Sequence, residues 1–281
     1  IRGVGTSNTD MAFDPGVGVF IDGVFLPRSV GALLDVVDIE QIEILRGPQG
    51  TLFGKNTVGG AINITTTKPK DAIEGFVLVR PGSRKTMLAR GMLNLPIGFG
   101  PFEDKLFTRL SFASVQDGGW VRNVPRDQNW SNRNTLAFLG SLRWLPTDRL
   151  TVDISGSWSQ DHSYAAGGQC VFIQETPLAG LFTDAGYDVE EACNKSQPFR
   201  NWSNTSQLQE TIAYGTWGTI DWDIGEIGGI DLQAKSLTSW REQDFRLRQD
   251  FDGTDLTIVQ VSDAGGGSPF DGQPGHQRQI Q

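Results

Sequence analysis

The chain has 281 residues, with 35 glycines, 10% aromatic residues and a formal net charge of −9. This length allows one large domain or two ordinary ones, and the composition favours a turn-rich β protein over a helical enzyme. A nucleic-acid partner is disfavoured because the net charge is negative and the basic residues are scattered. No stretch approaches the roughly 18 apolar residues of a membrane helix, although alternating segments that cross a membrane as strands remain possible.

Two short strands and a helix are predicted near the N-terminus. The segment Val17–Ile21 alternates in polarity, and the dipeptide Asp22-Gly23 is a turn signal. Val24–Leu26 can return as the second strand. Ser29 can cap a short helix over residues 30–36. The pattern predicts a small unit of mixed α/β structure.

Residues 37–69 read VDIEQIEILRGPQGTLFGKNTVGGAINITTTKP and predict two strands around a glycine loop. Glycines in such number let the backbone turn tightly and adopt positive φ without a Cβ clash. A phosphate-binding loop is disfavoured, because Gly50 and Gly54 enclose one residue too few before Lys55. Asn56 also stands where a serine or threonine would bind magnesium. The segment read alone therefore favours a structural turn.

The run ILRGPQGTLFGKNTVGGAINI closely resembles the plug-domain signature of TonB-dependent outer-membrane receptors. IRGVG at residues 1–5 and VGVFIDGV at residues 17–24 resemble earlier plug segments of that family. The resemblance assigns residues 1–70 to the C-terminal part of a plug domain, and Lys68-Pro69-Lys70 is interpreted as the hinge into the next part. It also implies a signal sequence, a TonB box and the first part of the plug upstream, and most of a barrel downstream.

From Asp71 onward the polarity alternates with a period of two, as in strands with one apolar face. These segments reach about ten residues, the length of a membrane strand rather than of a typical globular one. Large aromatic residues stand at the ends of the apolar rows, where aromatic girdles meet a bilayer interface. They are Trp144, Trp158, Trp222 and Trp240.

The connections between these segments alternate in length. Residues 98–104, 146–149 and 225–229 form short connections, and residues 117–132, 161–207 and 246–275 form long ones. Short turns at one end and long loops at the other are typical of outer-membrane barrels, and residues 81–85 depart mildly from this pattern. We predict a mainly β protein: a small α/β plug domain followed, in residues 71–281, by about seven antiparallel transmembrane β-barrel strands and the start of another. This incomplete barrel should turn its apolar face outward and hold the plug on its polar face.

No enzymatic, cofactor or metal site emerges from the sequence. The two histidines lie outside any GxSxG context, and the acidic residues near Gly253 depart from the calcium-loop spacing. Cys170 and Cys193 share one long polar segment without a nearby histidine, which disfavours a zinc site. A disulfide between them would close a loop of about 22 residues and contribute on the order of 3 kcal/mol. The alternative is two unpaired thiols.

Two sets of plug residues are candidates for function. Asn8, Phe25 and Arg28 stand in turns expected to face outward, and they combine hydrogen-bonding, stacking and charge for substrate binding. The alternative is that turns are polar anyway and that Phe25 covers the plug core. Glu43 and Arg46 are candidate plug-anchoring residues, since a barrel lumen lined with carboxylates offers Arg46 a bidentate partner. The alternative there is a solvated charge.

The resemblance implies an active transporter of the bacterial cell outer membrane with no covalent chemistry. Such a protein takes up a scarce solute: a ferric siderophore, cobalamin, haem or an oligosaccharide. The implied partners are the TonB–ExbB–ExbD complex, outer-membrane lipid and a small-molecule or metal-chelate ligand. One alternative is a passive porin or structural outer-membrane barrel, which the plug motif disfavours because open porins lack such a domain. A soluble β-sandwich enzyme or lectin is the other.

Overall fold

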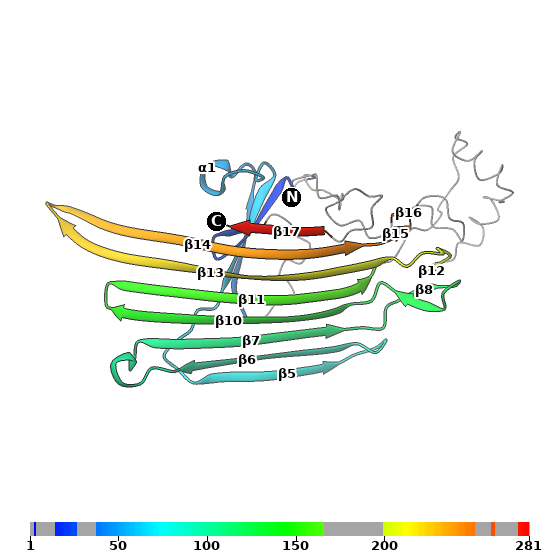
Figure 1. Ribbon diagram of the computed structural model, residues 1–281, viewed down its shortest axis with the longest axis horizontal. Helices are drawn as coiled ribbons and strands as arrows, with labels where there is room; N and C mark the ends of the chain where they lie inside the picture. The colour runs from blue at the N-terminus through cyan, green and yellow to red at the C-terminus, as the bar shows by residue number, and fades with distance from the viewer. Residues whose placement is uncertain are drawn as a thin grey trace.

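A computed structural model describes residue 3 and residues 15–26, 38–165, 199–250, 260–261 and 275–280. Strands dominate these residues, and the few helical segments are single turns, which confirms the mainly β prediction. None of the helices in these ranges is long and apolar enough to cross a membrane. The strands form a small sheet and a large sheet, with two minor sheets in the connections (Figure 1).

The small sheet has four strands in the order β2-β1-β4-β3, and they are β1 (Val17–Ile21), β2 (Val24–Leu26), β3 (Ile39–Arg46) and β4 (Gly60–Thr66). β1 and β2 form a hairpin whose turn residues Asp22 and Gly23 have φ of 49° and 84°, as a type I′ turn requires. β1 pairs parallel with β4, and β3 pairs antiparallel with it. The predicted glycine loop joins β3 to β4 and contains one helical turn, α1 (Gly50–Phe53).

The large sheet has eight strands in the order β17-β14-β13-β11-β10-β7-β6-β5. All neighbouring pairs are antiparallel. Seven strands are long and the eighth is short, which agrees with the predicted number. Their bounds are β5 (Glu74–Pro81), β6 (Met87–Pro96), β7 (Leu106–Gln116), β10 (Asn134–Thr147), β11 (Leu150–Tyr164), β13 (Leu208–Ile227), β14 (Ile230–Leu247) and β17 (Gly275–Ile280).

Short connections lie at one end of the large sheet and long ones at the other, as predicted (Figure 1). The short end includes the 3-10 turn η2 (Gly100–Phe102). At the long end, β8 (Val121–Asn123), β9 (Gln128–Trp130) and β12 (Arg200–Asn201) form a three-stranded sheet, while β15 (Gln249–Asp250) pairs with β16 (Gln260–Val261).

The long connection predicted at residues 117–132 is present and contains β8 and β9. One short connection differs from the prediction. The turn predicted at residues 225–229 is shorter, since β13 continues past a bulge after Asp223 to end at Ile227. The predicted helix over residues 30–36 lies outside the described residues.

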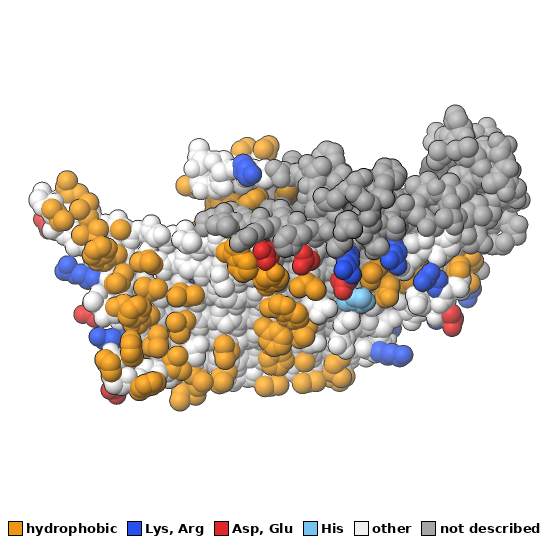
Figure 2. Space-filling view, viewed as in Figure 1, with side chains coloured by type: hydrophobic (Ala, Val, Ile, Leu, Met, Phe, Trp, Pro, Cys, Tyr) orange, Lys and Arg blue, Asp and Glu red, His pale blue; other side chains and the backbone are white. Residues whose placement is uncertain are grey.

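The two faces of the large sheet differ in exposure, and the predicted apolar row faces outward. The inner face was predicted to be polar, but it is apolar where it meets the small sheet, because packing of the two sheets buries Ala137, Leu139 and Trp217 there. Phe138 of β10 is 47% exposed, whereas its neighbours Ala137 and Leu139 are buried on the opposite face. Figure 2 shows hydrophobic side chains over the middle of the outer face, with charged side chains mainly toward its two ends. Exposed large hydrophobic side chains of the long strands include Phe138, Ile154 and Ile220.

The small sheet packs on the inner face of the large one. Its side chains that face the large sheet form one apolar cluster with residues of β7, β10 and β13: Val19, Ile21, Val24, Leu26 and Ile64 meet Ala113, Ala137, Leu139 and Trp217. The opposite face of the small sheet holds Phe20, whose ring packs against Phe25 and Phe53. The face of the small sheet that packs on the large sheet continues to Ile42 and Ile44 of the edge strand β3, which are exposed in the described structure.

Candidate functional site

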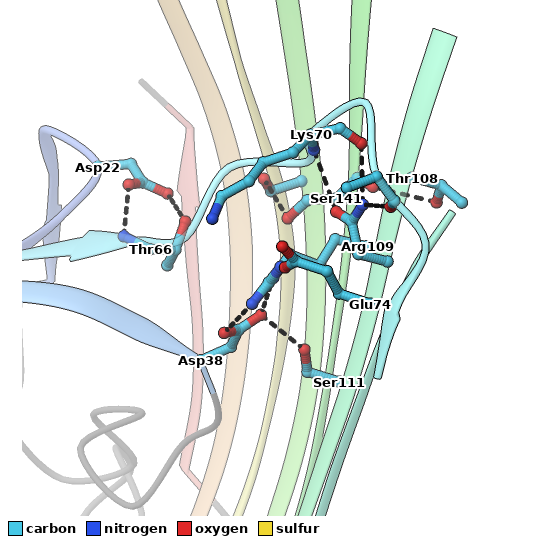
Figure 3. A network of polar contacts seen from close by, with 12 residues as sticks. Asp22, Asp38, Thr66, Lys70, Glu74, Thr108, Arg109, Ser111 and Ser141 are labelled. Carbon is cyan, nitrogen blue, oxygen red and sulfur yellow. Dashed lines mark hydrogen bonds and ion pairs between the residues drawn. The ribbon is translucent and has the colours of Figure 1, made fainter. Parts of the chain in front are cut away.

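The most concentrated polar contact between the two sheets joins Asp38 to Arg109. Asp38 directly precedes β3 and has a φ of 69°, which turns its side chain toward β7. Arg109 donates through both Nε and Nη2 to the Asp38 carboxylate, and the Nη2–Oδ1 distance is 2.7 Å. Ser111 Oγ donates to Asp38 Oδ2 at 3.0 Å (Figure 3). The result is a fork-to-fork ion pair with a supporting hydroxyl.

Arg109 lies where water has little access, since its side chain is only 6% exposed. Its Nη1 approaches Glu74 Oε2 of β5 at 3.6 Å, so the guanidinium lies between two carboxylates (Figure 3). A buried charge is tolerated only when it is paired and hydrogen-bonded. The pair therefore holds Asp38 firmly while both partners are present. Separating the two side chains inside the protein is unfavourable, because each charge would then be buried without a partner.

A second contact is centred on Asp22 in the β1–β2 turn. Its carboxylate, 4% exposed, accepts hydrogen bonds from Thr66 N at 3.0 Å and Thr66 Oγ1 at 2.7 Å. Trp217 Nε1 of β13 donates to Asp22 Oδ2 at 3.0 Å, and Lys68 Nζ lies 3.1 Å from the same oxygen. One carboxylate thus joins the first hairpin, the end of β4 and the wall of the large sheet.

A third contact fixes the chain where it passes from the small sheet to the large one. Asn94 of β6 is fully buried, and its Oδ1 accepts from Lys70 N at 3.0 Å. Its Nδ2 donates to the carbonyl oxygens of Lys70 and Ala72. The side-chain amide therefore acts as a clamp on the predicted hinge, meeting both the donor and the acceptor of residue 70.

These three contacts form the candidate functional site, which is an attachment rather than a reaction centre. Each pairs a side chain with a residue on the other sheet or with the connection between the sheets. A salt bridge, a carboxylate–indole bond and an amide clamp can each be broken and remade without chemistry.

The structure places the predicted anchoring residues elsewhere. Glu43 is exposed on β3 and accepts hydrogen bonds within the small sheet, from Asn63 Nδ2 at 2.9 Å and Gln41 Nε2 at 3.2 Å. Arg46 is also exposed and forms no ion pair with any residue in the described ranges. The contacts that hold the two sheets together there come from Asp38 and Asp22 instead. An anchoring role for Glu43 and Arg46 stays a prediction.

The predicted substrate-binding residues are only partly described. Phe25 is half-buried, with its ring centroid 5.4 Å from that of Phe20. Asn8 and Arg28 lie outside the described residues, as do Cys170 and Cys193 of the predicted disulfide. The binding role and the disulfide therefore stay predictions.

Sequence reasoning missed most of the residues that make the three contacts. Asp22 was visible only as a turn former, and Asn94 only as a polar position in an alternating strand. Arg109 offered a weak signal, because it is a lone cation in an inward row of otherwise small or apolar residues, Phe107, Ser111 and Ala113. Its partner Asp38 is 71 positions away in sequence, and nothing local connects the two.

Comparison with known proteins gives one matching family model. Residues 1–61 match the model described as TonB-dependent Receptor Plug Domain. Curated relatives include the pesticin receptor of Yersinia pestis, 28% identical over 239 residues that cover 83% of this chain and 32% of that protein. The ferric enterobactin receptor PirA of Pseudomonas aeruginosa is 28% identical over 143 residues, or 46% of this chain and 19% of that protein.

Solved structures share the fold. The ferric yersiniabactin uptake receptor FyuA from Yersinia pestis superposes with a TM-score of 0.65 at 18% identity, covering 84% of this chain and 33% of that one. The ferric-catecholate import receptor Fiu from E. coli gives a TM-score of 0.61 at 16% identity, covering 94% and 36%. This chain thus spans about a third of the length of the pesticin receptors.

Proposed function

We propose that this chain, whose residues 1–61 match the plug-domain model of TonB-dependent receptors, is part of an active transporter in the bacterial outer membrane. The small sheet is the plug, which we place in residues 1–70, and the large sheet is the barrel wall, in residues 71–281. The proposed transporter imports a ferric siderophore and draws its energy from the TonB–ExbB–ExbD complex. It performs no covalent chemistry on its cargo.

The observation that carries this proposal is the way in which the plug is attached. The plug contacts the wall through one apolar cluster and three separate polar contacts, those of Asp38, Asp22 and Asn94. A domain that blocks a channel permanently needs no buried ion pair, since apolar packing of the same volume is often as stable. Attachments that lose much of their strength once a partner moves away suit a plug that is displaced in each transport cycle.

The names of the relatives support a ferric siderophore as the cargo. They include a ferric enterobactin receptor and a ferrioxamine B receptor of Salmonella typhimurium, which is 26% identical over 149 residues, or 51% of this chain. None of the relatives cited here is named for cobalamin, haem or an oligosaccharide. The passive-porin alternative is weakened by a folded domain that packs on the inner wall where an open pore would be.

The proposal is tested by uptake in cells. A strain that lacks the full-length gene, and the same strain carrying it, are grown under iron limitation and supplied with radiolabelled ferric siderophores. Import that requires both the gene and a functional TonB protein is the expected result. Uptake that persists without TonB would favour a passive pore, and failure to import any ferric siderophore would overturn the proposed cargo.

A further inference from the structure

A pocket of about 510 Å³ lies among the long connections and is separate from the contacts between plug and wall. This volume falls within the range of small-molecule sites, roughly 300–1,000 Å³. Its lining combines two arginines with two aromatic rings, in the set Arg84, Gly119, Trp120, Arg122, Asn129 and Phe199. Within that lining no side chain is acidic, so the pocket offers positive charge beside flat apolar faces.

Three separate segments build the pocket, and backbone hydrogen bonds fix them together. Gly118 N donates to Arg84 O at 2.8 Å, which ties the β5–β6 turn to the segment before β8. A Cβ at Gly118 would lie 2.8 Å from that same oxygen, so this approach needs glycine. Arg122 N donates to Phe199 O at 2.8 Å and joins β8 to the segment before β12.

Buried polar side chains make this platform rigid. Asn123 is fully buried, and its Nδ2 donates to Asn201 Oδ1 at 3.2 Å and to Ser203 O at 2.8 Å. Its Oδ1 accepts from Arg126 N at 2.9 Å. Trp130 of β9, which pairs with Val121 of β8, is also fully buried. A site organised in advance loses less conformational entropy when a ligand binds.

Both aromatic side chains of the pocket are exposed, and the backbone of Phe199 is strained. Phe199 is 61% exposed and has a φ of 65°, a conformation that a bulky side chain rarely adopts. Its ring meets that of Trp120, which is 47% exposed, edge to face with centroids 5.4 Å apart. Backbone strain that displays an apolar ring to solvent does not help the fold. Such strain is typical of binding sites.

The charges of the lining side chains favour an anion, while Asp117, outside the lining, accepts a hydrogen bond from Gly119 N at 2.9 Å. Arg84 forms no ion pair with any residue in the described part of the chain. Arg122 pairs through Nη2 with Asp127 Oδ1, but both side chains are exposed, so this pair contributes little and can yield to a ligand. Two guanidinium groups can then donate to oxygen anions, and their planes can also stack on aromatic rings.

We propose that this pocket is an outer binding site for an anionic ferric chelate whose iron-binding oxygens are carried on aromatic rings, as in phenolates and catecholates. Trp120 and Phe199 stack against the rings, and Arg84 and Arg122 bind the ring oxygens or the excess negative charge. A hydroxamate chelate has neither the rings nor the charge and should bind poorly here. The inference rests on the proposed function, since it names the chemical class of the imported chelate.

The test is equilibrium binding to purified full-length protein, with the ferric complex of catechol as the anionic aromatic probe and ferrioxamine B as the hydroxamate probe. Arg84→Ala, Trp120→Leu and Phe199→Asn should each weaken catecholate binding about tenfold, which corresponds to about 1.4 kcal/mol. Asn tolerates the positive φ at position 199, so that variant removes the ring without further strain.

Lys85→Ala is the matched control. Lys85 follows Arg84 in the same turn, has a φ of 58° and carries the same charge, but it does not line the pocket. Unchanged binding in this control, with weakened binding in the three pocket variants, is the expected pattern. Pocket variants that bind the catecholate complex as tightly as the parent protein would overturn the inference, and so would tighter binding of ferrioxamine B.

Uptake assays separate this inference from the proposed function. If the parent strain imports ferric siderophores by a TonB-dependent route while the pocket variants bind normally, the pocket assignment fails and the transporter assignment stands. If no ferric siderophore is imported, the transporter assignment fails regardless of the pocket. Each variant must first show the folded barrel on unheated gels, so that a loss of binding is not a loss of structure.

Discussion

Arg109 is the single side chain on which the attachment of the plug depends most. It is almost completely buried, it binds Asp38 of the plug with two nitrogens, and it faces Glu74 on the first barrel strand. Replacing Asp38 by a neutral residue would leave the buried guanidinium of Arg109 without water and without its main ion-pair partner. Removal of only one partner of such a buried pair therefore causes the largest loss of stability.

We expect Asp38→Ala to lower the free energy of unfolding of the full-length protein by about 3–5 kcal/mol, the cost of breaking a buried pair. Glu74 and Ser111 remain near the guanidinium, which favours the lower end. Thermal unfolding in detergent measures the change, and sensitivity of cells to a large antibiotic reports leakage past the plug. Glu43→Ala is the control, because that exposed carboxylate bonds only within the plug in the described structure. Equal effects of the two substitutions would contradict the assignment.

Trp217→Phe tests the second contact. The substitution keeps an aromatic ring in the apolar cluster but removes the N–H that donates to Asp22. A hydrogen bond to a charged group contributes about 1.5–3 kcal/mol, and Asp22 keeps its bonds from Thr66, so we expect the lower figure. Chemical denaturation measures it. Trp144→Phe, on the outer face, should change stability much less, and a comparable loss there would show that ring size alone matters.

At the scale of elements, a side chain of strand β6 fixes the connection between plug and barrel, and residues within the connection do not. The residues from Lys70 to Ala72 bond to the side chain of Asn94 on β6. The turn sequence Lys68-Pro69-Lys70 by itself indicates only an end of β4. The clamp places the last residues of the plug at a fixed point of the wall, from which the remaining contacts can form or separate.

Asn94→Ala should loosen this connection without unfolding the barrel. Two backbone carbonyls and one N–H lose their partner in a buried site, and an unsatisfied buried group costs about 1–3 kcal/mol. Faster hydrogen exchange at the amide of Lys70 is the expected observation, with cleavage by trypsin after Lys70. Asn63→Ala, which removes an exposed amide of β4, serves as the control. Protection of residue 70 equal to that in the parent would rule out the clamp.

Elements differ in how well the sequence predicts them, for physical reasons. Long strands such as β10 and β11 were predictable, because one face meets solvent or lipid and the other meets the plug, so polarity alternates over many residues. The strands β8 and β9 have three residues each, too few for any period to show. The Asp38–Arg109 pair was not predictable, because it depends on how two sheets meet and not on either segment.

At the scale of the whole molecule, the large sheet separates two environments. The row that contains Phe138 faces outward, and the alternate row that contains Leu139 contacts the plug. A one-residue shift in register would exchange the two rows, so the contact with the plug and the proposed contact with lipid fix the same register. The predicted outward orientation of the Phe138 row is confirmed by its exposure, whereas the prediction of a polar plug-facing surface is wrong where Leu139 and Trp217 pack against the plug.

Phe138→Arg tests the outward face. A charge near the middle of the lipid-facing band costs about 2–4 kcal/mol, whereas one near the interface costs about 0–1 kcal/mol. The control is Gln160→Arg, which lies on the same outward face nearer the long connections and pairs with Leu136. We expect the folded, heat-modifiable form in membranes to decrease for Phe138→Arg and to persist for Gln160→Arg. Normal assembly of both variants would mean that this face does not meet lipid.

The parallel pairing of β1 with β4 has a mechanical consequence. Val17 opens β1 beside Gly60, which opens β4, and β4 ends at Thr66 on the way to the Asn94 clamp. A load applied from the N-terminal side thus acts on one end of the pair while the anchor holds the opposite end. The hydrogen bonds between the two strands are then sheared together instead of being peeled apart one by one. A pulling force on the chain should therefore move the plug away from the wall as a rigid body. The Asp22 and Asp38 contacts should break before the strands of the small sheet separate.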